Sequence, residues 1–175
     1  GGCFVVNAEV YHRVGGLDRD LYAHMEEVDL CWRIKNAGYS IAYVPESTVY
    51  HVGGSVISYG STQKLFYNFR NSLILLLKNE RSAKLCWLLP VRLVLDGVAG
   101  LQLLLQGKWK HTLTIIKAHF SFYGQLGLWL KKRAQNKALI TNRNTVGIYN
   151  KSIIWQYFAK KKRTFKALDF KTKSI

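Results

Sequence analysis

Residues 24–38 read HMEEVDLCWRIKNAG, and this stretch decides how the first part of the chain is interpreted. Its apolar side chains recur at three- and four-residue spacing, which predicts a helix over residues 26–37. Gly38 follows directly, and a glycine in this place typically ends a helix in the left-handed conformation. The first turn of the predicted helix therefore carries three carboxylates, which are those of Glu26, Glu27 and Asp29.

These three acids have two interpretations. The amino end of a helix favours negative charge, so capping and compensation of the helix dipole explain one or two of them. Three acids beside a glycine-containing turn also fit a general base or a metal-linked site. The local pattern by itself leaves both interpretations open.

Outward from this helix, short apolar runs alternate with short helical runs. Strands are predicted over residues 4–6, 40–44 and 48–51, a short extended segment over 21–23, and a further helix over 8–14 with Asn7 as its cap. Such alternation is typical of an α/β fold, which is the fold class we expect for residues 1–80.

After residue 60 the chain becomes helical and apolar. A helix is predicted over 62–78, and two apolar runs follow over 85–105 and 112–130. Each run is near the length of ~20 residues that crosses a bilayer. The runs contain charged residues, among them Arg92, Asp96 and Lys117, and these favour a hairpin that lies in the membrane surface. A hairpin that spans the membrane is one alternative. Packing of these helices on the catalytic core or in a dimer is another.

Charge is divided unevenly along the chain. Residues 1–60 carry seven acidic and four basic residues, a net of −3, whereas residues 61–175 carry three acidic and 22 basic residues, a net of +19. Since the bases flank the apolar runs, an anionic membrane surface is favoured over nucleic acid as the partner. The three cysteines have no CxxC spacing, which indicates neither a disulfide framework nor a zinc site and favours a cytoplasmic setting.

Several short motifs occur in a fixed order along residues 1–80: Gly15–Asp18, Glu26–Arg33, Gly38-Tyr39, Val44–Glu46, His51–Ser55, and then Tyr67, Arg70 and Asn71. In this order they resemble the family 2 glycosyltransferases, and most closely the rhamnosyltransferase-like bacterial branch. The resemblance implies a GT-A fold, which is α/β with a Rossmann-like nucleotide-binding half. It also implies inverting transfer from a nucleotide-diphosphate sugar to a lipid-linked or glycan acceptor, in cell-envelope polysaccharide synthesis.

The resemblance also implies roles for individual residues. Glu27 occupies the position of the family's catalytic base, where the family usually has Asp, and Glu26 shares or orients the acceptor. Contacts to the acceptor or to diphosphate are implied for Asp29, Arg33, Arg70, Gly53, Gly54 and Ser55. His51 is implied as a ligand of Mg²⁺ or Mn²⁺. Local spacing leaves simpler alternatives, because Asp29 can also cap its helix or pair with Arg33 at i+4.

We interpret the chain as three parts: the C-terminal part of a catalytic domain over 1–80, an apolar helical hairpin over 81–133, and a basic tail over 134–175. The family's nucleotide-binding segment and its Asp-x-Asp metal motif would precede Gly1, so we expect a truncated enzyme that transfers nothing alone. The expected location is the cytoplasmic face of the bacterial inner membrane. The alternatives are a non-catalytic basic module that binds membrane or nucleic acid, and a degenerate transferase that serves as a scaffold.

Overall fold

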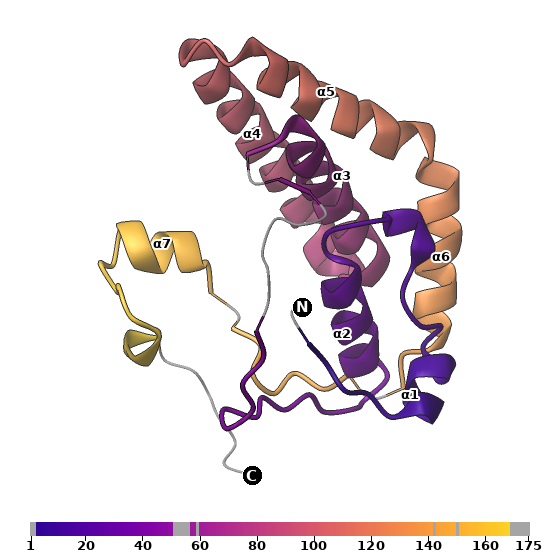
Figure 1. Ribbon diagram of the computed structural model, residues 1–175. Coiled ribbons are helices and arrows are strands. Elements are labelled where there is room, and N and C mark those ends of the chain that lie inside the picture. Colours follow the sequence, from indigo (N-terminus) through magenta and orange to yellow (C-terminus); the bar gives the residue numbers. More distant parts are fainter. Residues whose placement is uncertain (1–2, 51–56, 59, 142, 150, 169–175) are drawn as a thin grey trace.

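The computed structural model describes residues 3–50, 57–58, 60–141, 143–149 and 151–168. These residues form seven α-helices and two short 3₁₀ helices (Figure 1). The α-helices are α1 (Ala8–Arg13), α2 (Glu26–Asn36), α3 (Thr62–Asn79), α4 (Ser82–Leu105), α5 (Trp109–Gly124), α6 (Leu126–Ala138) and α7 (Ile153–Phe158). The 3₁₀ helices are η1 (Arg19–Leu21) and η2 (Phe165–Ala167).

The predicted α/β fold class is wrong, because the described residues contain no β-strand and hence no Rossmann-like or GT-A sheet. Residues 4–6, 40–44 and 48–50 have no regular secondary structure, and residues 21–23 form the end of η1 and a turn. Val5 is 99% exposed and Tyr43 is 85% exposed. An apolar run becomes a strand only when a neighbouring strand pairs with its backbone, and the described part of the chain supplies no such neighbour.

The helices predicted from local signals are confirmed. Helix α2 begins at Glu26 as expected, and Gly38, just beyond its end, has a φ of +92°. The side chain of Asn7 caps α1 by accepting the backbone N–H of Val10 at 3.1 Å. Ser61 caps α3 in the same way by accepting the N–H of Lys64 at 3.2 Å.

Helix α3 lies at the centre of the molecule and packs against α2, α4, α5 and α6 (Figure 1). Its buried face joins the larger apolar core, which consists of Leu21, Leu73, Ile74, Leu75, Leu77, Phe122 and Trp129. A smaller core joins α1 to α2 through Val14, Leu30, Ile34 and Ala37. Both cores meet at α2, because Trp32 packs against the larger core while Leu30 and Ile34 belong to the smaller one.

Helices α4 and α5 form an antiparallel hairpin that extends away from α2. The predicted second run, 112–130, is divided at Gln125 between α5 and α6. In the described chain, α4 alone is long and apolar enough to cross a membrane, and only 11% of its apolar window is buried. Two charged residues within α4 form an ion pair, since Arg92 Nε lies 2.7 Å from Asp96 Oδ1, and His119 approaches the other carboxylate oxygen at 3.1 Å.

Candidate functional site

The candidate acids follow a backbone segment in an unusual conformation. Tyr22, His24 and Met25 all have positive φ values, of 63°, 65° and 70°. Met25 is the residue that precedes α2, and its side chain makes no capping hydrogen bond. Side chains other than glycine rarely adopt this conformation, and such strain persists only where the surroundings enforce it. Residues 22–25, which we call the strained loop, therefore need an external support.

Helix α3 supplies that support through two adjacent side chains. The amide of Asn71 donates to the carbonyl oxygens of Leu21, Ala23 and His24 at 3.0, 2.9 and 2.7 Å. Arg70 donates to the carbonyls of Asp20 and Leu21 at 3.1 Å each, and to Asn71 Oδ1 at 2.9 Å. Both side chains are buried, so these hydrogen bonds are made away from water.

Tyr67 completes the same group. Its ring lies 5.4 Å from that of Tyr22, and the Arg70 guanidinium stacks over it at 5.2 Å. The residues matching the family's Tyr-x-x-Arg-Asn element thus all lie against the strained loop. Arg70 holds backbone carbonyls here, and its contact with diphosphate stays a prediction.

Glu26 and Glu27 are half-buried in the first turn of α2. Burial raises the pKa of Glu27, but hydrogen bonding to its carboxylate, from its own backbone N–H among others, outweighs this and leaves the pKa below its usual value. Glu27 is therefore ionised at neutral pH, as a general base must be. Glu26 Oε2 is buried and receives no hydrogen bond from the described residues, so it is available to a ligand hydroxyl.

Asp29 is fully buried and belongs to a network that joins α2 to α3. Its carboxylate accepts hydrogen bonds from Arg33 Nε at 2.9 Å, Lys78 Nζ at 3.0 Å and Asn79 Nδ2 at 2.7 Å. Arg33 also donates to the carbonyls of Val14 and Gly16. The predicted i+4 pairing of Asp29 with Arg33 is confirmed, and both side chains are used in packing. Their predicted contacts with acceptor or diphosphate remain untested.

Asp18 and Asp20 have an Asp-x-Asp spacing that the sequence analysis did not single out. Lysines neutralise both: Lys78 Nζ lies 2.5 Å from Asp18, and Lys132 pairs with Asp18 and, at 2.5 Å, with Asp20. In the described part of the chain, no group of three His, Cys, Asp or Glu side chains is arranged to hold a metal ion. The Mg²⁺ or Mn²⁺ that the resemblance implied stays a prediction, because His51, its implied ligand, lies outside the described residues.

Four of the predicted site residues, His51, Gly53, Gly54 and Ser55, lie outside the described residues. Their predicted roles toward metal and diphosphate stay predictions.

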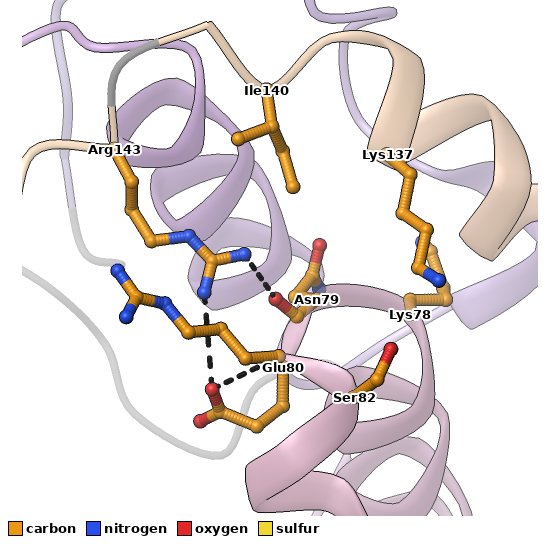
Figure 2. Close-up of a pocket in the computed structure, with 8 residues that line it drawn as sticks. Lys78, Asn79, Glu80, Ser82, Lys137, Ile140 and Arg143 are labelled. Carbon is orange, nitrogen blue, oxygen red and sulfur yellow. Dashed lines mark hydrogen bonds and ion pairs between the residues drawn. The ribbon is translucent and has the colours of Figure 1, made fainter.

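The corner between α3 and α4 is lined by basic side chains that the sequence analysis did not assign to the site. Figure 2 shows Arg143 directed toward Asn79 and Glu80, with Lys137 across a small pocket of about 260 Å³. A larger pocket of about 530 Å³ lies between α2, the start of α4 and residues 143–148. We call it the basic pocket, and its lining is Val28, Cys31, Trp32, Lys35, Glu80, Arg81, Lys84, Arg143, Thr145 and Ile148.

Arg133 fixes this corner from α6. It donates to the carbonyl of Leu77, to that of Glu80 at 2.9 Å and to Ser82 Oγ at 3.1 Å. The signal that could have found the corner is the sequence Glu80-Arg81-Ser82, a charged break between two apolar helices. The contribution of Arg143, about sixty residues later, has no local signal.

Comparison with known proteins points to a sugar transferase. Two curated proteins of Mycobacterium tuberculosis, from strains CDC 1551 (Oshkosh) and H37Rv (ATCC 25618), are named N-acetylglucosaminyl-diphospho-decaprenol L-rhamnosyltransferase. Each is 28% identical to this chain over 102 residues, which is 58% of this chain and 32% of the relative. The chain thus spans about a third of the length of the curated relatives it matches. The similarity is distant and partial, and it supports a relation to glycosyltransferases at that coarse level.

No protein-family model matches the chain, and no solved structure matches it significantly.

Proposed function

We propose that this chain is part of a glycosyltransferase that moves a sugar from a nucleotide-diphosphate sugar to a lipid-linked acceptor with inversion, in cell-envelope polysaccharide synthesis. The observation that carries the proposal is the similarity to two rhamnosyltransferases whose names specify a diphospho-decaprenol substrate. The geometry at the start of α2 supports it, because Glu27 is ionised and Glu26 keeps a buried carboxylate oxygen without a partner among the described residues.

In the proposed reaction, Glu27 is the general base. Its carboxylate accepts the proton of the acceptor hydroxyl while that oxygen forms a bond to the anomeric carbon of the donor. The bond from this carbon to the diphosphate oxygen breaks, and the electron pair leaves with the nucleoside diphosphate. Attack from the side opposite the leaving group inverts the anomeric centre. Glu26 Oε2 accepts a hydrogen bond from the acceptor and orients it.

The strained loop and its supports serve this reaction by placing the two acids. Asn71 and Arg70 hold the residues that immediately precede Glu26, and the buried Asp29 fixes the next turn of the helix. A base must lie within hydrogen-bond distance of the proton that it removes, so this support from both sides matters for the rate. These are positioning residues in the proposal, since they act through Glu26 and Glu27.

The proposed location is the cytoplasmic face of the bacterial inner membrane. The exposed apolar surface of α4 and α5 supports contact with lipid, and the excess of basic residues after residue 60 supports an anionic surface. A divalent cation stays a proposal from the resemblance, and no step is derived through it.

The test compares the 175-residue chain with a polypeptide extended through the coding sequence upstream of Gly1. Both are incubated with membrane lipid extract and a panel of nucleotide-diphosphate sugars that includes a rhamnose donor, and nucleoside diphosphate release is followed. The extended protein is expected to turn over one donor and the 175-residue chain none. Glu27→Gln is expected to lower the rate by about a hundredfold or more, while Glu9→Gln, an exposed acid on α1, leaves it unchanged.

Turnover that survives Glu27→Gln would leave the transferase intact and remove Glu27 as its base. An extended, folded protein that releases no nucleoside diphosphate from any donor contradicts the proposed function. In that case the scaffold gains support, and the exposed apolar face of α4 makes a membrane-binding module the second candidate.

A further inference from the structure

Basic side chains outnumber acidic ones in the described lining of the basic pocket. These described residues include four basic side chains, those of Lys35, Arg81, Lys84 and Arg143, and one carboxylate, that of Glu80, which is a net charge of +3. Glu80 lies 3.9 Å from Arg143 and accepts the backbone N–H of Arg81 at 2.7 Å. The pKa of Arg143 is lowered, first by burial and then by the positive charge of Arg81. Anionic groups entering the pocket would relieve this repulsion.

The walls of the pocket are suited to a ligand larger than a single ion. Its volume is about 530 Å³, and Val28, Trp32 and Ile148 supply apolar surface beside the cations. The backbone N–H groups at the start of α4 lie at the same corner, and Arg81, the residue before the helix, makes no capping hydrogen bond with its side chain. A diphosphate, with two charged groups, matches the net charge of +3 better than the single charge of a phosphodiester does.

The pocket continues as an apolar surface along α4. From Lys84, the side chains at successive spacings of three and four residues are Leu88, Val91, Leu95 and Val98. All four are apolar, and Val91, Leu95 and Val98 are among the exposed large hydrophobic residues of the molecule. A ligand with an anionic head and a hydrocarbon chain would therefore meet complementary chemistry at both ends.

We propose that the basic pocket binds the diphosphate group of a membrane lipid whose hydrocarbon chain lies along this face of α4. The proposal rests on the proposed function for the sugar that such a lipid carries. Glu27 lies four residues before Cys31, which lines the pocket, so both project from the same face of α2. A sugar attached to the diphosphate would then extend toward Glu26 and Glu27.

The test measures binding of the 175-residue chain to vesicles, without any sugar donor. Phosphatidylcholine vesicles containing a polyprenyl diphosphate are compared with phosphatidylcholine vesicles in which phosphatidylglycerol supplies the same surface charge. The variant Arg81→Gln/Lys84→Gln removes two exposed cations of the pocket, and Lys108→Gln/Lys110→Gln removes two exposed cations at the far end of α4. Circular dichroism verifies that both variants keep the helical content of the parent.

The chain is expected to prefer the diphosphate vesicles, and inorganic pyrophosphate is expected to compete. Arg81→Gln/Lys84→Gln should weaken this binding by about tenfold or more, and Lys108→Gln/Lys110→Gln by much less. Equal binding to both vesicle types, or equal losses from the two variants, would overturn the proposal in favour of general attraction to anionic membrane. Pyrophosphate bound equally well without lipid would assign the pocket to a soluble diphosphate instead.

Failure of the pocket assignment and failure of the proposed function can be distinguished by experiment. Selective binding by a protein that transfers no sugar leaves the pocket assignment standing and contradicts only the proposed function. Sugar transfer by a protein whose vesicle binding is unchanged by Arg81→Gln/Lys84→Gln supports the proposed function and contradicts only the pocket assignment.

Discussion

The side-chain amide of Asn71 donates to the backbone carbonyl of His24 at 2.7 Å and so joins α3 to the residue two positions before Glu26. The same amide group also donates to the carbonyls of Leu21 and Ala23. Replacing Asn71 by Ala removes the Asn71 hydrogen bonds to the carbonyls of Ala23 and His24, while the carbonyl of Leu21 keeps its hydrogen bond from Arg70. We expect a loss of about 1–3 kcal/mol in the free energy of unfolding, measured by urea titration.

The matched control is Asn68→Ala, which removes an amide side chain one turn earlier on α3. Its backbone carbonyl accepts Ser72, and that bond survives the substitution. Equal destabilisation by the two variants would show that Asn71 has no special role in holding the loop. In the extended protein, Asn71→Ala is also expected to lower the turnover rate, because Glu26 and Glu27 lose their fixed position.

Asp29 is the acid whose loss should cost most. Asp29→Asn leaves the guanidinium of Arg33 buried without its carboxylate partner, while Lys78 keeps its ion pair with Asp18. We expect a loss of about 3–5 kcal/mol in the free energy of unfolding, because breaking a buried pair strands a charge. Glu46→Gln, at an exposed position, should change stability little, and a similarly mild effect of Asp29→Asn would contradict the network.

Asp18 predicts how stability depends on pH. Burial raises the pKa of Asp18, but its ion pairs with Lys132 and Lys78 outweigh this and lower the pKa from 3.8 to about 2. A lowered folded-state pKa stabilises the protein above the unfolded pKa, and this stabilisation is lost as the pH falls toward 2. The shift corresponds to about 2 kcal/mol. Urea unfolding of the parent and of Asp18→Asn should therefore differ above roughly pH 4 and converge near pH 2.

The exposed face of α4 predicts membrane binding that is independent of charge. Leu95 is 49% exposed and Val98 is 57% exposed. Leu95→Asn/Val98→Asn should lower binding to phosphatidylcholine vesicles by about tenfold while leaving the free energy of unfolding nearly unchanged. Tyr50→Asn, an exposed aromatic residue outside the hairpin, is the control and should bind as the parent does. Lost stability with unchanged binding would indicate that this face packs against protein instead.

Prediction from the sequence succeeded where the physical cause is local. Asn7 and Gly38 mark helix ends because a cap or a left-handed residue acts within one turn of the backbone. The pair Asp29–Arg33 was predicted for the same reason, since residues four apart on a helix are neighbours. The predicted strands were wrong because a strand needs a partner elsewhere in the chain for its backbone hydrogen bonds. Val5 and Tyr43, in two of the predicted strands, are exposed instead.

The sequence by itself determined the bounds of most helices up to residue 105, the pairing of Asp29 with Arg33 four positions later, and the apolar, basic character of the second half. Only the tertiary structure decided which charges are neutralised by residues far away in the sequence. Lys78 joins Asp29 across 49 positions and Lys132 joins Asp18 across 114, and Arg143 lies 3.9 Å from Glu80 in the basic pocket. The physical reason is that helix formation depends on neighbours within a turn, while the balance of charge depends on groups that meet only when the helices pack.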